Sequence, residues 1–180
     1  DPLSFRLNML AKQHEPSAKL LETVAEMSNW GASSQTGSAK GVAFSYSFGT
    51  PVATVCEVVQ KDEMIELSNI WIACDVGTAL DPGNIEAQMV GGSLYGLSAA
   101  LYGEITFYDG EVEQTNFPDY DAIRMANCPK FEVKILENNP YIGGVGEAST
   151  PPAAPALTNA LFALTGQRAR KLPLYHQFNL

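Results

Sequence analysis

The spacing of hydrophobic positions changes along the chain, and it begins with a helical period. Asp1 followed by Pro2 is typical of a helix start, and apolar residues follow as far as Leu10. Pro16 begins a second segment with apolar residues at helical spacing. The Gly/Ser-rich stretch "GASSQTGSAKG" then predicts a mobile connector. These features predict an N-terminal helical arm with a connector over residues 1–40.

From residue 42 to residue 75 the pattern is that of strands. "VAFSYSF" alternates between apolar and polar positions, and "PVATVCEVV" is rich in β-branched residues. "MIELSNIWIACDV" follows across the polar turn "QKDE". Three strands joined by short turns predict an antiparallel meander. The cluster "DVGTALDPGN" is expected to close it with a turn.

The second half mixes helices with short strands. Asp81 and Pro82 open a helix over "NIEAQMVGGSLYGLSAAL", and "GEITFYDGEVEQTNF" predicts a hairpin that turns at Asp109 and Gly110. An irregular segment "PDYDAIRMANCP" leads to the strand "KFEVKIL", and a final helix is expected over residues 151–165. The predicted fold class is α+β, with an antiparallel sheet and packed helices in one domain over residues 41–180.

Composition and charge narrow the functional class. The chain has 180 residues, 46% of them hydrophobic, which suits one globular domain with a real core. Twenty acidic and 11 basic residues give a net charge of −9, which opposes extended contact with nucleic acid or anionic lipid. No apolar run reaches the ~18–20 residues of a membrane span. Because the chain starts with Asp rather than Met, we expect it to be part of a longer protein.

Most familiar catalytic chemistries lack their residues here. His14 and His176 lie near the two ends and are expected at the surface, which disfavours a Ser/His/Asp site. Asp119 and Asp121 are expected in a solvated loop. The glycine-rich stretches "GGSLYGL" and "GGVGE" lack the layout of a nucleotide-binding motif. The three widely spaced cysteines are expected to be reduced, buried core residues rather than metal ligands. They are Cys56, Cys74 and Cys128.

One carboxylate stands out by its surroundings. Glu147 follows the glycine-rich "GGVG" and precedes a helix start at which Ser149 or Thr150 can cap the first turn. It could complement the helix dipole, a contribution of about 0.3–1 kcal/mol. If a ligand or partner instead covers the glycine loop, desolvation favours the protonated form and tunes the carboxyl as a general base. Local chemistry leaves both interpretations open.

The helix over residues 82–101 carries a second candidate surface. Gln88, Gly92 and Gly96 recur at four-residue steps, so they share one face of the helix. Each helical glycine costs about 1 kcal/mol relative to alanine, which indicates a reason for retaining them. Close packing by a neighbouring helix and close approach by a ligand both explain the pattern.

Three long segments together resemble a known family. They are "CDVGTALDPGNIEAQMVGGSLYGLSAALYGEI", "VEQTNFPDYDAIRMANCPKFEVKIL" and "GGVGEASTPPAAPALTNALFALTGQRARKLPL". In this order they resemble the C-terminal part of the molybdenum-binding subunit of the xanthine dehydrogenase/aldehyde oxidase family. The bacterial isoquinoline 1-oxidoreductase beta-subunit branch is the most similar, and the resemblance extends over essentially the whole chain.

The resemblance implies a fold, a cofactor and a reaction. The fold is that of a molybdenum cofactor-binding domain, and the cofactor is a molybdopterin-type molybdenum group. The reaction hydroxylates an aldehyde or an N-heteroaromatic carbon with oxygen taken from water. In that family the glutamate of the GVGE motif acts as the base, a role that carries over to Glu147. The family's glutamine beside the pterin carries over to Gln88, while Gly92, Gly144 and Gly146 would leave room for the cofactor.

The resemblance also implies partners. The family's other glycine-rich cofactor loop and its iron–sulfur cysteines have no counterpart in this chain. We therefore expect the remainder of the molybdenum-binding subunit and an iron–sulfur subunit as partners, and no bound molybdenum in this chain by itself. The compartment, bacterial cytoplasm or periplasm, stays open. The alternative is a non-catalytic homologue or assembly module that uses the same fold without molybdenum.

Overall fold

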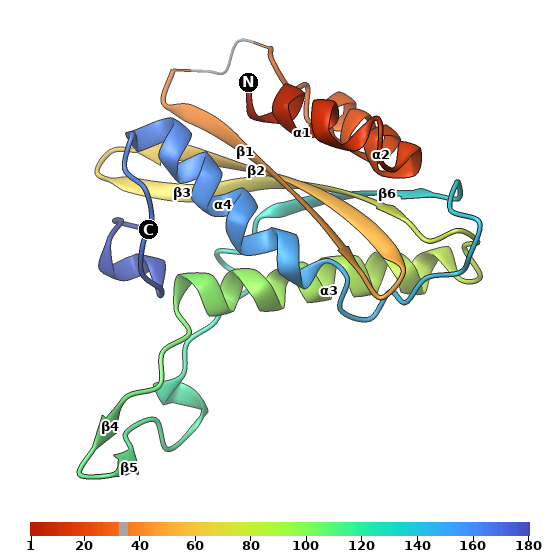
Figure 1. The fold of residues 1–180 in the computed structure, drawn as a ribbon. Coiled ribbons are helices and arrows are strands. Elements are labelled where there is room, and N and C mark those ends of the chain that lie inside the picture. The colour runs from red at the N-terminus through yellow and green to blue at the C-terminus, as the bar shows by residue number, and fades with distance from the viewer. Residues whose placement is uncertain (33–35) are drawn as a thin grey trace.

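A four-stranded sheet with helices on both faces forms the body of the protein (Figure 1). The structure is a computed structural model that describes residues 1–32 and 36–180. The helices are α1 (Pro2–Leu10), α2 (Glu15–Met27), α3 (Pro82–Leu101) and α4 (Thr150–Thr165), with short 3-10 turns η1 (Phe117–Asp119) and η2 (Leu174–His176). The sheet strands are β1 (Ser38–Ser47), β2 (Thr50–Lys61), β3 (Met64–Asp75) and β6 (Lys130–Leu136), and a hairpin consists of β4 (Phe107–Tyr108) and β5 (Glu111–Val112).

The sheet is mixed, in the order β1-β2-β3-β6. The predicted antiparallel meander is confirmed for β1, β2 and β3. The strand predicted over residues 130–136 is also confirmed, but it pairs with β3 in parallel, with Ile72 opposite Val133. The expectation of a wholly antiparallel sheet is therefore corrected. The physical reason is the long connection through α3, which returns the chain to the end from which β3 started, as a parallel pair requires.

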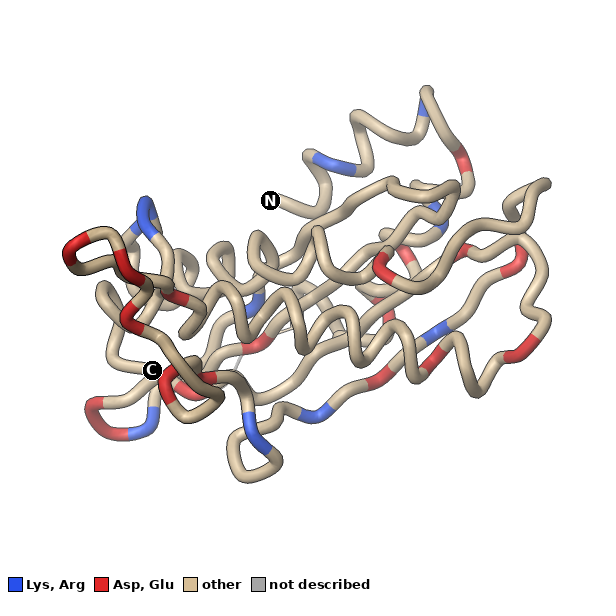
Figure 2. Tube along the Cα trace, turned by 90° about the horizontal axis from the view of Figure 1, so that it is seen from below, with Lys and Arg blue, Asp and Glu red and all other residues tan. Residues whose placement is uncertain are grey.

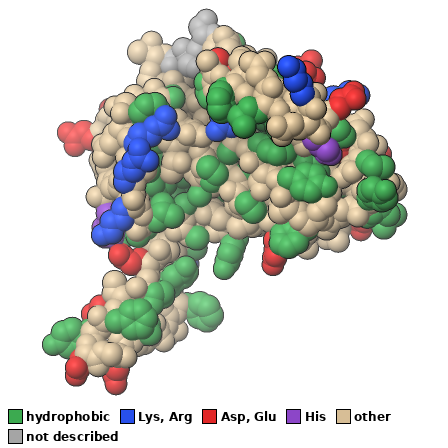
Figure 3. Space-filling view, viewed as in Figure 1, with side chains coloured by type: hydrophobic (Ala, Val, Ile, Leu, Met, Phe, Trp, Pro, Cys, Tyr) green, Lys and Arg blue, Asp and Glu red, His purple; other side chains and the backbone are tan. Residues whose placement is uncertain are grey.

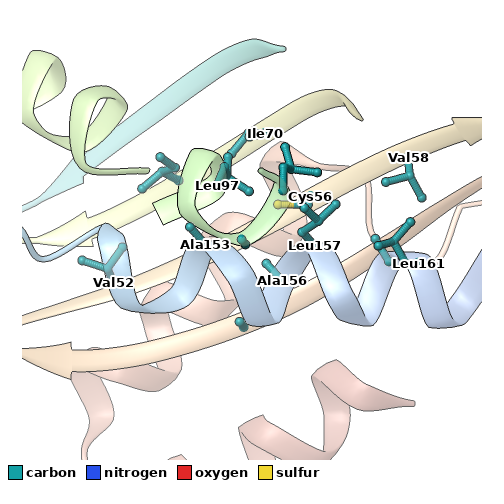
Figure 4. Close-up of a cluster of buried hydrophobic side chains, with 14 of the residues drawn as sticks. Val52, Cys56, Val58, Ile70, Leu97, Ala153, Ala156, Leu157 and Leu161 are labelled. Carbon is teal, nitrogen blue, oxygen red and sulfur yellow. The ribbon is translucent and has the colours of Figure 1, made fainter. Parts of the chain in front are cut away.

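Two hydrophobic layers hold the helices to the sheet. Helices α1 and α2 cover one face, where Leu20 and Val24 of α2 pack near Val55 of β2. Helices α3 and α4 cover the other face (Figure 1). Figure 4 draws part of this larger cluster, in which side chains of α4 and Leu97 of α3 meet the strands. Its labelled residues are Val52, Cys56, Val58, Ile70, Leu97, Ala153, Ala156, Leu157 and Leu161.

Several local predictions can be compared with the structure. The helix starts at Asp1 and Asp81 are confirmed, since both side chains accept a hydrogen bond from the first turn. The connector predicted over residues 31–41 is shorter, because β1 already begins at Ser38, and its residues 33–35 lie outside the described part. The division of the chain at residue 40 stays a prediction.

The cysteine expectation is right for two residues and wrong for the third. Cys56 and Cys74 are buried, and burial raises the pKa of both thiols, that of Cys74 to about 12. Cys128 is exposed, because it lies in the irregular segment before β6 and outside the core. All three thiols are free.

The hairpin predicted around Asp109 and Gly110 is confirmed, and it belongs to a segment that projects from the body (Figures 1 and 3). Both turn residues have positive φ, 49° and 82°, as a tight two-residue hairpin turn requires. We call residues 104–128 the β4–β5 extension. The extension leaves the C-terminal end of α3 and returns to the start of β6, so it is the connection between them.

Helix α4 approaches strand β1 so closely that only glycine fits at the contact. A Cβ atom on Gly41 would stand 2.1 Å from the nitrogen of Ala160 and 2.3 Å from the oxygen of Ala156. Both are backbone atoms of a regular helix and cannot move aside individually. The position of α4 on the sheet therefore depends on the missing side chain of Gly41.

We predict that Gly41→Ala destabilises the protein by at least about 1–3 kcal/mol, because the added methyl group separates α4 from β1. Chemical denaturation followed by circular dichroism measures the change. The matched control is Gly91→Ala, an exposed position in α3 with no atom within 4 Å of the added Cβ. It should stabilise the protein by up to about 1 kcal/mol through helix propensity. An unchanged unfolding midpoint in Gly41→Ala would contradict this packing.

Candidate functional site

The loop that carries Glu147 connects the end of β6 to the start of α4 and is held by backbone hydrogen bonds. The amide of Gly143 donates to the carbonyl of Val76 at 3.1 Å, just beyond β3. The amide of Gly144 donates to the carbonyl of Phe48 at 2.8 Å, in the turn between β1 and β2. The loop is therefore attached to two neighbouring connections before it reaches Glu147.

Glu147 itself is exposed at the surface. Its carbonyl accepts a hydrogen bond from the amide of Thr150 at 3.0 Å, while its carboxylate has no hydrogen bond or ion pair with any described residue. The backbone of the residue is thus fixed by the first turn of α4, and the side chain is available to a group from outside. An exposed carboxylate suits the helix-dipole interpretation. The general-base interpretation requires a ligand or partner that covers the loop.

The capping expected from Ser149 or Thr150 is wrong. Ser149 stands at the N-cap of α4 but makes no side-chain capping bond, and its buried hydroxyl has no partner among the described residues. The hydroxyl of Thr150 donates instead to the carbonyl of Gly92 at 2.9 Å. Both side chains face α3, so contact between the helices takes precedence over capping.

The glycines before Glu147 have different surroundings. A Cβ on Gly143 would stand 2.0 Å from the hydroxyl oxygen of Thr50, and one on Gly144 would stand 3.2 Å from the Cβ of Phe48. Around Gly146 the same atom would meet nothing within 4 Å. The first two glycines are explained wholly or partly by packing within the chain. Gly146 has open space beside it and no positive φ to explain it.

The glycines of α3 are also explained by packing. A Cβ on Gly92 would stand 2.5 Å from the hydroxyl oxygen of Ser149, and one on Gly96 would stand 2.7 Å from the carbonyl oxygen of Thr150. Of the two explanations left open by the sequence, close approach by a neighbouring helix therefore holds for both. The assignment of Gly92 to a cofactor stays a prediction.

Gln88 lies one helical turn before this contact, and its side chain is exposed. Four residues correspond to about 6 Å along the helix axis. Gly92 contacts Ser149 and Thr150, which are two and three residues after Glu147, so Gln88 and Glu147 belong to the two segments that meet there. The structure thus has an exposed amide and an exposed carboxylate on the two segments that meet at this contact.

The other residues considered for chemistry do not join this region. His176 is exposed and its ring contacts Glu104 at 2.8 Å, while His14 is half-buried and accepts a bond from the start of α2. Asp119 and Asp121 are exposed, as predicted for a solvated loop. A groove of about 530 Å³ lies at the other end of α3, next to Leu101, and neither Glu147 nor Gln88 lines it.

Two further properties concern the described part of the chain as a whole. Its His, Cys, Asp and Glu side chains form no group of three or more that could hold a metal ion. Within residues 1–32 and 36–180, every helix is too short or too polar to cross a membrane. Basic residues lie scattered among the more numerous acidic ones (Figure 2), in agreement with the net charge of −9.

Sequence reasoning missed one buried acidic side chain near the loop. Asp75 ends β3 and is fully buried, and Asn139 at the start of the loop is buried beside it. The signal was present in "ACDVG", where an acidic residue terminates an otherwise apolar strand. An acidic residue in that position is expected only when hydrogen bonds compensate its burial.

Comparison with known proteins defines the class to which the fold belongs. The family described as molybdopterin cofactor-binding domain matches residues 7–129, more than half of the chain. The chain belongs to the molybdopterin cofactor-binding domain family. The matched residues include Gln88 and Gly92 but end before the loop that carries Glu147.

Curated relatives extend the similarity beyond that match. The chain is 36% identical to the isoquinoline 1-oxidoreductase subunit beta of Brevundimonas diminuta, over 97% of this chain and 23% of the relative. It is 28% identical to a membrane-bound aldehyde dehydrogenase of Gluconacetobacter polyoxogenes, whose name includes pyrroloquinoline quinone, over 97% of this chain and 25% of the relative. The chain therefore spans about a quarter of the length of these relatives.

Solved structures support the fold. The quinoline 2-oxidoreductase of Pseudomonas putida superposes with a TM-score of 0.59 at 20% identity, over 69% of this chain and 17% of that chain. A Cu,Mo-CO dehydrogenase superposes with a TM-score of 0.58 at 23% identity, over 65% of this chain and 16% of that chain. The predicted α+β, molybdenum cofactor-binding fold is confirmed, with the mixed sheet described above.

The surroundings of the loop glycines generate a prediction that needs no ligand. Gly146→Ala should change the unfolding free energy by less than about 0.5 kcal/mol, as for a surface change that meets no atom. Gly143→Ala should cost at least about 1–3 kcal/mol, because its methyl group would collide with Thr50. Denaturant titrations of both variants measure the difference. Equal destabilisation would show that Gly146 has a structural reason of its own.

Proposed function

We propose that this chain is the part of a molybdenum hydroxylase that presents the catalytic base. The enzyme would oxidise an aldehyde or N-heteroaromatic substrate with oxygen derived from water. The observation that carries the proposal is the contact between α3 and the start of α4: the exposed Gln88 lies one turn before it on α3, and the exposed Glu147 and the unobstructed Gly146 lie just before it in the loop. Membership of the family and the kinds of substrate named for its relatives support the same conclusion.

The residues at this junction fit a molybdopterin-type cofactor that approaches from outside the chain. Gly146 leaves space that a Cβ would otherwise occupy, which suits close approach by a bulky group. The chain offers no cluster of metal ligands in its described part, so its contacts would be with the organic part of the cofactor and with the substrate. When bound, the cofactor supplies the activated water-derived oxygen and accepts the electrons of the substrate.

Glu147 would accept the proton that the hydroxylation releases. A general base must present a free lone pair within hydrogen-bond reach of the proton, and the carboxylate of Glu147 has no internal partner to displace. Its backbone is held by Thr150, so a rigid helix start supports the base. This arrangement limits the freedom of the reacting group without occupying its oxygens.

Gln88 would orient the cofactor from the neighbouring helix. A glutamine side chain offers two N–H donors and a carbonyl acceptor, which match the alternating donors and acceptors at the edge of a heterocycle. It lies one turn before Gly92 on α3, the helix that contacts the start of α4. Gly92 itself would act indirectly, by allowing α3 to approach α4 closely enough for both groups to reach one ligand.

The chain would complete this site together with the remainder of the molybdenum-binding subunit, and an iron–sulfur subunit would take up the electrons. The relatives are about four times as long, so most of the subunit lies outside this chain. The β4–β5 extension offers a surface for that contact (Figure 3). Seven large apolar side chains are exposed on it. They are Ile105, Phe107, Tyr108, Val112, Phe117, Tyr120 and Met125.

We predict that Glu147→Gln lowers kcat at least about 100-fold in the intact enzyme, because an amide cannot accept the proton. The molybdenum content should stay nearly unchanged, because the substitution keeps the shape of the side chain. Steady-state kinetics and metal analysis of the same preparation measure both quantities. The matched control is Glu132→Gln, an exposed glutamate on β6, which should retain full activity.

Two outcomes of that experiment would contradict the proposal. Substantial turnover by Glu147→Gln removes Glu147 as the base. Absence of molybdenum from the assembled wild-type protein favours the alternative, a non-catalytic homologue or assembly module. Extraction of the cofactor separates these cases from a quinone enzyme of the kind named for one relative. The 180-residue chain by itself is expected to retain no molybdenum.

We also predict that the isolated chain self-associates through the β4–β5 extension. Phe117 and Met125 are 90% and 99% exposed, and burying such side chains is favourable. The double variant Phe117→Ser/Met125→Ser should shift light-scattering masses towards the monomer. The control is Leu80→Ser, at an equally apolar residue outside the extension that is 78% exposed. A monomeric wild type at all concentrations, or an equal effect of the control, would overturn this role.

A further inference from the structure

The end of strand β3 contains a buried acidic side chain that binds two distant segments together. Asp75 is fully buried. Its Oδ1 atom accepts hydrogen bonds from the backbone amides of Gly77 at 3.2 Å, Asn138 at 3.0 Å and Asn139 at 3.0 Å. Its Oδ2 atom is also buried and has no partner among the described residues. One carboxylate oxygen thus collects three N–H groups from segments more than 60 residues apart.

Burial of a carboxylate is unfavourable unless hydrogen bonds compensate the lost water. Here three backbone amides do so, and bonds to a charged acceptor are stronger than bonds between neutral groups. The converse also holds, because without Asp75 these buried amides would lose their acceptor. The carboxylate and the start of the loop therefore stabilise each other in the buried site.

Asn139 extends this contact to the turn between β1 and β2. Its side chain is buried and donates from Nδ2 to the carbonyl of Gly49 at 2.9 Å. The next anchors are the amides of Gly143 and Gly144, which reach Val76 and Phe48. The loop is thus attached alternately to the end of β3 and to the β1–β2 turn, twice to each.

The loop lies so close to the end of β3 that only glycine fits at position 77. Its φ is +77°, and a Cβ there would stand 2.1 Å from the carbonyl oxygen of Tyr141. No side chain fits between the turn and the loop. The hydrogen bonds of Asp75 therefore act on a segment that is already in van der Waals contact with the strand end.

From these contacts we propose that Asp75, together with Asn139, is a positioning residue that sets where Glu147 stands. Only a few residues separate the last anchor of the loop, Gly144, from Glu147, and Thr150 fixes the chain on the other side. Movement of the anchored segment would thus shift the carboxylate relative to Gln88. The catalytic consequence rests on the proposed function, whereas the structural consequence does not.

The structural consequence is tested by amide hydrogen exchange in the 180-residue chain. In Asp75→Ala the amides of Asn138 and Asn139 lose their acceptor directly. The informative amides are those of Gly143 and Gly144, which do not touch Asp75. They should exchange about 10- to 100-fold faster, because the loop loses the contact that holds its start. Unchanged exchange at both glycines would overturn the proposal.

Two comparisons separate positioning from general destabilisation. Val55→Ala removes core volume on the α2 face of the sheet and should lower global stability while leaving Gly143 and Gly144 protected relative to the core. Asp75→Asn keeps an oxygen acceptor and should retain most of the protection. If Asp75→Ala does not fold, Asn139→Ala takes its place, since it breaks only the bond to Gly49. Its expected effect is a smaller acceleration at the same two amides.

The intact enzyme then distinguishes this proposal from that for Glu147. Asp75→Ala should lower kcat at least about tenfold with little change in KM, because a displaced base affects the chemical step more than binding. Asp75→Asn should restore most of it. If Glu147→Gln lowers kcat but Asp75→Ala does not, Asp75 has no positioning role. If Glu147→Gln stays active, the base assignment fails and hydrogen exchange alone decides the role of Asp75.

Discussion

The rest of this structure depends on two backbone contacts that only glycine permits: that of α4 with β1 and that of α4 with α3. Gly41 lets α4 lie directly on β1, and Gly96 lets α3 lie against the first turn of α4. Helix α4 is therefore held from two sides at backbone distance, where side chains cannot adjust. The position of α4 also determines where the residues just before it lie. The packing of α4 therefore places Glu147, although Glu147 lies outside the helix.

The glycines of this chain serve two different physical purposes that the sequence cannot separate. At Gly92 and Gly143 a methyl group would collide with atoms of the chain itself, so internal packing explains them. At Gly146 the same methyl group would meet no atom, and the backbone is not in a left-handed conformation. Internal packing gives no reason for that residue. The open space at Gly146 leaves room for a group from outside the chain, which is the sense in which it supports the proposed site.

Much of the fold follows from local sequence signals, and the exceptions depend on contacts that are distant in sequence. Helix starts at Asp1 and Asp81 and the turn at Asp109 were predictable because capping and turn geometry involve neighbouring residues. The parallel pairing of β6 was not, since the direction of a strand depends on the path of the chain between strands. Of the candidate site, the sequence indicated Glu147 and Gln88. The capping roles of Ser149 and Thr150 were wrong, because the hydroxyl of Thr150 bonds to Gly92 of α3 and that of Ser149 is packed close to the same residue.

Two carboxylates near the same loop differ in what their oxygens can still do. Asp75 is fully buried, and its one hydrogen-bonded oxygen already accepts from three amides, so it is occupied in holding the loop. Glu147 is exposed, and its carboxylate has no partner in the described part of the chain, so a proton there would break nothing. A base that must take up and release a proton in each cycle needs an environment like that of Glu147, in which no internal hydrogen bond occupies the carboxylate. The rigidity that positions such a base has to come from other groups. In our proposal the buried Asp75 and its hydrogen bonds to the loop provide it.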